Sequence, residues 1–284
     1  MARSSEFADS AVGALYDRAA HLPLEQLGFN LHVGYWEDSQ DETPYREAAE
    51  RLTDLVTKRL RVGPGRRSLD VGCGAGGPAL RVARATGSTV VGVNISREQL
   101  AFACALAERE EMTDLLSFRH ADGTALPFDA DSFDAVWAVE SMPHMDRARV
   151  LREMSRVVRP GGRVVITDMF ARKPAAEARQ EVLERFREAW MVGPLASIGD
   201  YPALLRDAGL RLLELADLTE HVLGRSLPSL AGPVDGAQHT SAGPAGAEVG
   251  DQAALAYLAD LAEGGELGYL LLVAEYLPEL TPVP

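Results

Sequence analysis

From residue 68 onward, short apolar runs alternate with longer segments of helical periodicity. The runs lack the strict alternation of a half-exposed strand, so they predict strands that are buried on both faces. Strands of this kind, separated by helices, form a parallel sheet with helices on both faces. The pattern therefore predicts an α/β fold. The five strands expected in this region are 68–71, 89–94, 115–122, 133–141 and 163–170.

Start and stop signals locate the helices between these strands. Ser96 and Gln99 have the spacing of a capping box, which predicts a helix that ends near Arg109. A helix is also expected from about Pro78. Another covers 146–157 and ends before a Pro-Gly-Gly turn.

The two flanks of this region differ from it. Before it, Thr43 suits an N-cap and Pro44 the first position of a helix whose apolar residues recur up to Leu60. After it, Phe186 and Trp190 stand at helical spacing, which favours core packing, or a lid helix over an apolar ligand. The later elements expected are helices over 177–191 and 200–208 and strands over 210–215 and 268–276.

The chain is acidic. Its 284 residues carry 28 Lys and Arg against 42 Asp and Glu, a net charge of −14, with a sequence pI near 4.9. Such a surface repels phosphate backbones and anionic lipid. We therefore expect neither nucleic acid nor a membrane surface as a partner.

Cysteine usage and hydropathy point to a reducing compartment. Cys73 and Cys104 are too few for a disulfide framework or a cysteine zinc site. The first residues lack the apolar core of a signal peptide. The longest apolar run, Leu267 to Leu277, is broken by Glu275 and is too short to cross a bilayer. These features predict a cytoplasmic protein.

The strongest chemical signal is Asp-Val-Gly-Cys-Gly-Ala-Gly-Gly over 70–77, which follows the first strand. Gly72, Gly74 and Gly77 satisfy the pattern G-x-G-x-x-G, which lets a ligand approach the backbone at a strand-to-helix turn. Asp70 distinguishes between cofactors, because a carboxylate is unfavourable beside a pyrophosphate and favourable beside an ammonium or sulfonium. S-adenosylmethionine carries both cations and no phosphate. The alternative is that Asp70 merely caps the turn.

Together with this loop, three further segments resemble class I S-adenosylmethionine-dependent methyltransferases, and the resemblance covers nearly the whole chain. It implies S-adenosylmethionine as the cofactor and a Rossmann-like sheet of seven strands, mostly parallel, with one late antiparallel strand. The three segments are HADGTALPF (120–128), FDAVWAVES (133–141) and LREMSRVVRPGGRVVITD (151–168).

A closer resemblance is to bacterial natural-product methyltransferases of the rebeccamycin and rifamycin type. It rests on Asn-Leu-His-Val-Gly-Tyr-Trp over 30–36 and on Glu-Ser-Met-Pro-His-Met over 140–145. The resemblance implies a small-molecule acceptor in secondary metabolism or antibiotic biosynthesis. Relatives are commonly homodimers, and the sequence leaves the oligomeric state open.

We expect a single methyltransferase domain over 1–284. Residues 1–66 would form an N-terminal helical cap, 67–170 the cofactor-binding core, and 171–284 lid segments with the final strands. The stretch 231–250 is rich in Gly, Ala, Pro and Ser. It favours a mobile lid, with a plain disordered loop as the alternative.

The resemblance also implies a set of cofactor-binding residues. Asp122 matches the acidic residue that contacts the adenine amino group. Asn94 stands where many relatives grip the ribose with an acid, and Gln99, five positions on, matches a subfamily that tolerates this change. Aromatic rings before the core would favour the sulfonium through cation–π attraction. The residues expected at the cofactor are Tyr16, His32, Tyr35, Asp70, Gly72, Gly74, Asn94, Gln99, Asp122, Gly123 and Glu140.

Two residues at the carboxyl edge of the sheet are candidates for catalysis. His144 follows the fourth strand and Asp168 ends the fifth, where open α/β folds bind ligands. We expect His144 to be a general base, with Asp168 as its orienting partner or as an acceptor for the substrate hydroxyl. Pro143 replaces the first histidine of a pair found in close relatives, which argues against a two-histidine mechanism. The alternative for His144 is a structural bond to a backbone carbonyl. No spacing of metal ligands is recognisable, so no metal is expected.

These residues favour methyl transfer to oxygen, then nitrogen, then carbon. A methyltransferase fold that has become a non-methylating cyclase is a second hypothesis. A nicotinamide-dependent oxidoreductase is a third, because it shares the glycine pattern, although it lacks a role for Asp70 and Asp122.

Overall fold

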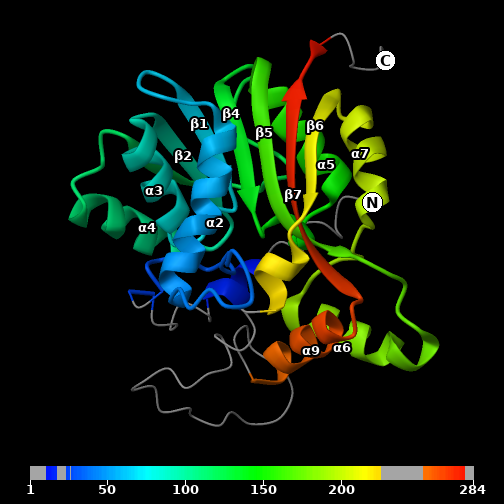
Figure 1. Ribbon diagram of the computed structural model, residues 1–284. Helices are drawn as coiled ribbons and strands as arrows, with labels where there is room; N and C mark the ends of the chain where they lie inside the picture. Colours follow the sequence, from blue (N-terminus) through cyan, green and yellow to red (C-terminus); the bar gives the residue numbers. More distant parts are fainter. Residues whose placement is uncertain (1–10, 18–23, 26, 225–251, 279–284) are drawn as a thin grey trace.

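One seven-stranded sheet organises the molecule (Figure 1). The computed structural model describes residues 11–17, 24–25, 27–224 and 252–278. The strand order is β3-β2-β1-β4-β5-β7-β6. Neighbouring strands are parallel except for the two pairs made by β7, which runs antiparallel to β5 and β6. The predicted Rossmann-like α/β fold with a late antiparallel strand is confirmed.

The elements alternate along the chain as the pattern predicts. The strands are β1 (Arg67–Val71), β2 (Thr89–Asn94), β3 (Leu116–His120), β4 (Phe133–Val139), β5 (Val158–Ala171), β6 (Leu210–Asp217) and β7 (Leu267–Tyr276). The helices are α2 (Tyr45–Leu60), α3 (Gly77–Thr86), α4 (Arg97–Arg109), α5 (Arg147–Val157), α6 (Gln180–Trp190), α7 (Tyr201–Asp207) and α9 (Gln252–Glu263), and residues 11–17 and 219–224 are also helical.

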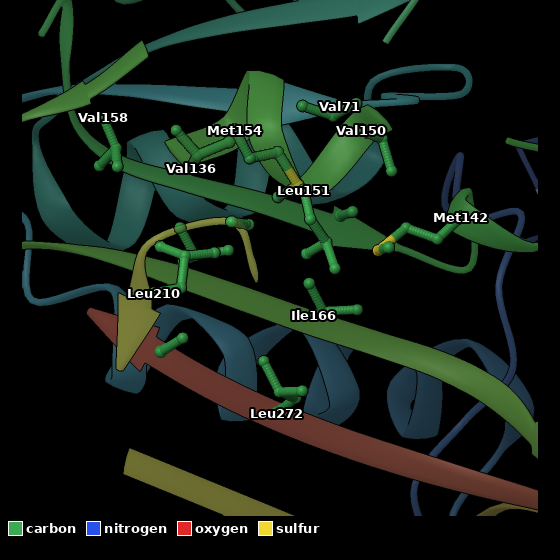
Figure 2. Packing of buried hydrophobic residues seen from close by; sticks show 14 of the residues in the cluster. Val71, Val136, Met142, Val150, Leu151, Met154, Val158, Ile166, Leu210 and Leu272 are labelled. Atoms are coloured by element: carbon green, nitrogen blue, oxygen red, sulfur yellow. The ribbon is translucent and has the colours of Figure 1, made fainter. Parts of the chain in front are cut away.

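The central strands are buried on both faces, which explains why their sequences do not alternate. Successive residues of a strand point to opposite faces. Val164 and Ile166 of β5 therefore pack with α5 and α7, whereas Val165 packs in the layer of α2, α3 and α4. Figure 2 shows part of the first layer, where Leu151 and Met154 of α5 meet the sheet.

A third cluster lies beyond the carboxyl edge of the sheet. There α6 and α9 pack on each other, and in Figure 1 they lie below the central strands. Phe186 of α6 and Leu258 of α9 are buried in this cluster with Tyr269 of β7. The cluster also contains Val33 and Leu52, so it joins the N-terminal and C-terminal segments over one end of the sheet.

Most predicted boundaries lie within a few residues of the observed ones. The predicted strand 163–170 is an exception, because β5 already starts at Val158, where it pairs with Phe133 before a register shift. The helix over 11–17 lies within the N-terminal helical cap expected over 1–66, whereas the helices over 219–224 and 252–263 were not predicted. The predicted lid, 231–250, lies outside the described residues.

The glycine loop packs tightly against the N-terminal segment. A Cβ on Gly77, the first residue of α3, would lie 2.6 Å from the carbonyl oxygen of Phe29 and 2.9 Å from that of Gly28. Both neighbours are backbone atoms, which cannot move aside cheaply.

We therefore expect Gly77→Ala to lower the free energy of unfolding by about 1–3 kcal/mol, as overpacking does. Gly224→Ala is the matched control, because among the described residues outside its own helix turn no atom lies within 4 Å of the added Cβ, and it should change stability by less than about 0.5 kcal/mol. Urea unfolding of both variants measures the difference. Equal stability of the two variants would contradict tight packing at this turn.

Candidate active site

Two adjoining cavities lie at the carboxyl edge of the sheet. The first, which we call the cofactor cavity, encloses about 890 Å³, including the part open to solvent. The strand order reverses between β1 and β4, the point where open α/β sheets bind ligands. Its polar or glycine lining residues include Tyr16, His32, Asp70, Gly72, Gly74, Asn94, Gln99, Asp122, Gly123, Glu140, Ser141 and His144.

The glycine loop forms the floor of the cofactor cavity. Gly72 has φ +83°, and a Cβ there would lie 2.3 Å from the Cβ of Ser141; Gly74 has φ +53°. The N–H groups of Gly72 and Cys73 donate to the carbonyl of Val93 at 2.8 and 3.0 Å. The turn after β1 is therefore fixed against the end of β2. Because Gly72 and Gly74 have no side chain, a ligand in the cavity can approach the backbone of this turn closely.

Asp70 lines this cavity and has one carboxylate oxygen without a hydrogen-bond partner among the described residues. Its side chain is 2% exposed, and its Oδ2 has no hydrogen-bond donor among the residues that the structure describes. Burial raises the pKa of Asp70 to about 8. A buried acceptor without a donor is costly, so the site is suited to a ligand that brings a donor or a positive charge.

Asn94 and Gln99 form one amide pair in the wall of the same cavity. The Nδ2 of Asn94 donates to the Oε1 of Gln99 at 2.8 Å, and both side chains are buried. The backbone N–H of Gln99 donates to the Oγ of Ser96, which caps α4 as predicted. The Gln99 side chain therefore serves the cavity wall instead of completing the capping box.

Asp122 lines the cavity from a short turn after β3. Its carboxylate accepts the N–H and the hydroxyl of Thr124, both at 2.7 Å. Each oxygen keeps a lone pair for a ligand donor. Next to it, a Cβ on Gly123 would lie 2.8 Å from the Sδ of Met145 and from a methyl of Val71, so this position has no room for a side chain.

Glu140 is held in a strained backbone conformation. Its φ is +53°, which is uncommon outside glycine. Its Oε1 accepts the N–H of Val33 at 3.0 Å and the hydroxyl of Tyr269 at 2.7 Å. Burial raises the pKa of Glu140 to about 7. The side chain lines both cavities.

The N-terminal motif contributes His32 but not Tyr35. The Nδ1 of His32 lies 2.9 Å from the carbonyl of Val33, and burial lowers the pKa of His32 to about 4, so the ring is neutral. Tyr35 lines neither cavity. Its ring stacks on that of His221, with centroids 5.0 Å apart. The prediction that Tyr35 binds the cofactor is not supported by this placement.

The second cavity, which we call the acceptor cavity, adjoins the first and encloses about 620 Å³, including open solvent. It shares Tyr16, Leu31, Gln99, Glu140 and His144 with the cofactor cavity. The rest of its wall is apolar and comes from the β5 end, the turn before α5, and α6 with the residues after it. These residues are Pro143, Met169, Phe186, Trp190 and Val192.

His144 stands on the wall that the two cavities share. Its Nε2 lies 2.7 Å from the hydroxyl of Tyr16, and its Nδ1 lies 3.3 Å from the carbonyl of Met191. Burial lowers the pKa of His144 to about 4, so the imidazole is neutral near pH 7. A neutral imidazole at this point can accept a proton.

The predicted contact between Asp168 and His144 is wrong. Asp168 shares its face of β5 with Ile166 and Phe170, on the side of α5 and α7, so it points away from both cavities. Its Oδ2 lies 3.3 Å from the hydroxyl of Tyr201 and 3.6 Å from Arg147. Asp168 is fully buried, which raises its pKa to about 7.

Sequence reasoning missed several residues that act on His144. The carbonyl of Met191 takes the place predicted for Asp168. The residue before His144 is also held in place, because the N–H of Gly193 donates to the carbonyl of Pro143 at 2.8 Å. Arg147 donates to the carbonyl of Pro194 at 2.8 Å. These bonds join the segment after α6 to the turn that carries His144. They cannot be predicted from the local sequence, because their partners lie far apart along the chain.

The fold and the cofactor cavity together define the class I S-adenosylmethionine-dependent methyltransferases. A family model described as "Methyltransferase domain" matches residues 69–166. The chain is 46% identical over 210 residues to "Methyltransferase GfsG" of Streptomyces halstedii, covering 74% of this chain and 76% of that protein. It is 41% identical over 213 residues to "27-O-demethylrifamycin SV methyltransferase" of Amycolatopsis mediterranei, covering 74% and 77%.

A solved structure, the "[4+2]-Cyclase SpnF", has 28% sequence identity and a TM-score of 0.73, and the match covers 95% of this chain and 97% of that one. The chain belongs to the S-adenosylmethionine-dependent methyltransferases of the natural-product type, and S-adenosylmethionine is its cofactor. The hypothesis of a nicotinamide-dependent oxidoreductase is therefore wrong.

Two further observations concern the described part of the chain alone. There, His, Cys, Asp and Glu side chains form no group of three or more that could hold a metal ion. No helix in the same residues has the length and apolar character needed to cross a membrane.

Asp168 is expected to stabilise the fold through Arg147, whose side chain is only 9% exposed. At pH 8, where the carboxyl is mostly ionised, Asp168→Ala should lower the free energy of unfolding by about 3 kcal/mol, because it leaves the buried guanidinium of Arg147, the Tyr201 hydroxyl and the Met169 N–H without the carboxylate. Arg185→Ala is the control. That side chain is exposed and forms only loose pairs with Glu181 and Glu188, so its loss should cost less than about 0.5 kcal/mol. Urea unfolding compares the two, and equal losses would contradict a structural role for the buried pair.

Proposed function

We propose that this enzyme transfers the methyl group of S-adenosylmethionine to a hydroxyl group of a small, largely apolar natural product. The observation that carries the proposal is the neutral imidazole of His144 on the wall shared by the cofactor and acceptor cavities. A hydroxyl must lose its proton as it is methylated, and a base at the junction of the two cavities is placed to take it.

The residues of the cofactor cavity fit S-adenosylmethionine. The unpaired Oδ2 of Asp70 is suited to the ammonium group of the methionine part. The Asn94 and Gln99 amides are suited to the ribose hydroxyls and Asp122 to the adenine amino group. Glu140 adds a carboxylate on the side of the acceptor cavity. We assign Tyr16, His32, Gly72, Gly74 and Gly123 to the rest of the binding surface.

When bound, the cofactor supplies an electrophilic methyl group on a positively charged sulfur. The chain's own part in the reaction is to hold the acceptor in line with that methyl group, to keep water out, and to remove the proton. Phe186 and Trp190 supply the apolar wall that would exclude water. The Met191 carbonyl keeps the proton of His144 on Nδ1, which leaves Nε2 as the proton acceptor.

The apolar acceptor cavity and the named relatives support this substrate class. The Amycolatopsis relative is named for O-methylation of a rifamycin, an antibiotic. An amine or carbon acceptor remains the second proposal for the same site, and a cyclase without methyl transfer is the third, since one similar solved structure bears that name. Product mass separates them: methyl transfer adds one CH2 to the acceptor, and cyclisation adds nothing.

The test is a panel of hydroxylated polyketide lactones, terpenoid alcohols and phenols, incubated with the enzyme and S-adenosylmethionine and followed by mass spectrometry. We expect a product heavier by one CH2 that matches the synthetic O-methyl standard and forms together with S-adenosylhomocysteine. An N- or C-methylated product would overturn the oxygen assignment. A product isobaric with its substrate would overturn methyl transfer itself.

Cofactor binding should depend on pH through Asp70. The pKa of this group is raised to about 8, so in the free protein the carboxyl is mostly protonated at pH 6 and must lose its proton to hold a cation. Affinity for S-adenosylmethionine should therefore rise roughly tenfold or more between about pH 6 and pH 7.5, and binding should release a proton. Isothermal titration calorimetry in two buffers of different ionisation enthalpy measures both.

Asp70→Asn should weaken binding and reduce this pH dependence. Asp134→Asn, a change at the start of β4 outside both cavities, should leave both unchanged. If the Asp70→Asn variant kept the slope of the wild type, the titrating group would have to be another one, with Glu140 as the next candidate because its pKa is about 7.

His144→Ala should lower kcat by roughly 10²-fold or more, the usual contribution of a general base, while affinity for S-adenosylhomocysteine stays within a few-fold. His120→Ala is the control, since this exposed residue of β3 lines neither cavity. Because the pKa of His144 is about 4, kcat of the wild type should show no acid limb from this group above about pH 5. A loss of only a few-fold in the His144 variant would indicate an acceptor that needs no base.

A further inference from the structure

The hydroxyl of Tyr16 is hydrogen-bonded to Nε2 of His144, the nitrogen that would accept the proton if His144 is the base. Tyr16 Oη lies 2.7 Å from His144 Nε2, and the two rings meet edge to face with centroids 5.3 Å apart. Both residues belong to the walls of the cofactor and acceptor cavities. The contact therefore lies where an acceptor atom must approach a bound methyl group.

The partners of His144 fix the direction of this hydrogen bond. The carbonyl of Met191 can only accept, so the proton of the neutral imidazole is on Nδ1. Nε2 then has one lone pair and no proton, and Tyr16 is the donor. An acceptor hydroxyl cannot donate to the same lone pair while Tyr16 occupies it.

Tyr16 can nevertheless accept a hydrogen bond itself. A phenol oxygen that donates its proton keeps lone pairs for another donor. Burial, with the nearby Glu140 carboxylate, holds the pKa of Tyr16 well above its usual range, so the phenol keeps its proton in the resting enzyme. A hydroxyl in the acceptor cavity can therefore reach His144 through Tyr16.

The helical segment 11–17 is anchored at several points, which favours such a path over displacement of the ring. Two of its own side chains, Val12 and Leu15, are buried. The carboxylate of Asp17 accepts the hydroxyl of Ser96 at 2.6 Å and the N–H of Glu98 at 3.4 Å. This end of the segment is thus tied to the start of α4, one residue from Tyr16.

We propose that Tyr16 is a catalytic residue that relays the proton of the acceptor hydroxyl to His144. The acceptor oxygen gives its proton to Tyr16 Oη while Tyr16 gives its own proton to His144 Nε2. The new oxygen–methyl bond forms as the sulfur–methyl bond breaks, the positive charge of the sulfonium disappears, and the imidazolium later loses its proton to water. This assignment rests on the proposed transfer to oxygen.

The hydrogen bond is tested without any acceptor. In the complex with S-adenosylhomocysteine, ¹⁵N NMR of the histidine rings should show His144 with its proton on Nδ1 and with Nε2 as a hydrogen-bond acceptor. Tyr16→Phe should shift the Nε2 resonance and leave the tautomer unchanged. An unshifted resonance in a variant that still binds S-adenosylhomocysteine would remove the contact and the relay with it.

The relay is tested with the panel alcohol that is methylated fastest. Tyr16→Phe should lower kcat by roughly tenfold to a hundredfold. The affinity for S-adenosylhomocysteine should stay within about threefold, because phenylalanine keeps the ring that lines the cofactor cavity and removes only the hydroxyl. The double variant Tyr16→Phe, His144→Ala should be no slower than His144→Ala, because groups that act as a unit are not additive. Tyr276→Phe, at the far end of β7 and outside both cavities, should leave kcat unchanged.

A solvent isotope measurement separates a relay from a structural role. In the wild type, kcat in mixtures of H2O and D2O should fall along a curve, which indicates two protons in motion. An unchanged or higher kcat in Tyr16→Phe would show that the hydroxyl only covers the base, and it would overturn the proposal. Product analysis of the wild type tests the proposed function separately. An N- or C-methylated product would contradict the proposed transfer to oxygen. An O-methyl product together with an unaffected Tyr16 variant would contradict the relay alone.

Discussion

The rest of this site depends on the desolvation of carboxylates at the carboxyl edge of the sheet. Parallel strands place the buried Asp70 and the half-buried Glu140 at the ends of two neighbouring strands, and desolvation raises their pKa values to about 8 and 7. The free protein carries this cost as an acceptor without a donor on Asp70. A cofactor that carries an ammonium and a sulfonium offsets this cost, so the burial that raises these pKa values also favours a cationic ligand over a phosphate-bearing one.

His144, the proposed base, is positioned by the backbone and not by a second carboxylate. The Met191 carbonyl, which follows α6, sets the tautomer of His144. The bonds from Gly193 to the Pro143 carbonyl and from Arg147 to the Pro194 carbonyl hold that segment in place. A neutral backbone acceptor does not stabilise an imidazolium as a carboxylate does, which agrees with a histidine that is neutral at rest and holds its proton briefly.

The arrangement also explains how one fold can serve methyl transfer and other reactions. The polar wall of the cofactor cavity is built from the ends of β1 and β2 and the turn after β3. The acceptor cavity receives its apolar wall mainly from the β5 end and α6. Five residues, Tyr16 and His144 among them, join the two. Changes in the acceptor wall can therefore redirect the chemistry while the cofactor wall stays intact.

Features that depend on neighbours along the chain could be predicted from the amino-acid pattern. Apolar runs placed the strands, Ser96 capped its helix, and the glycine loop with Asp70 indicated the cofactor. Which side chains meet across the site depends instead on how the elements pack in three dimensions. Tyr16 and His144 meet although they are 128 residues apart. Asp168 lies outside both cavities because alternate residues of a strand face opposite layers. Such contacts depend on how distant elements pack, and no local pattern records that.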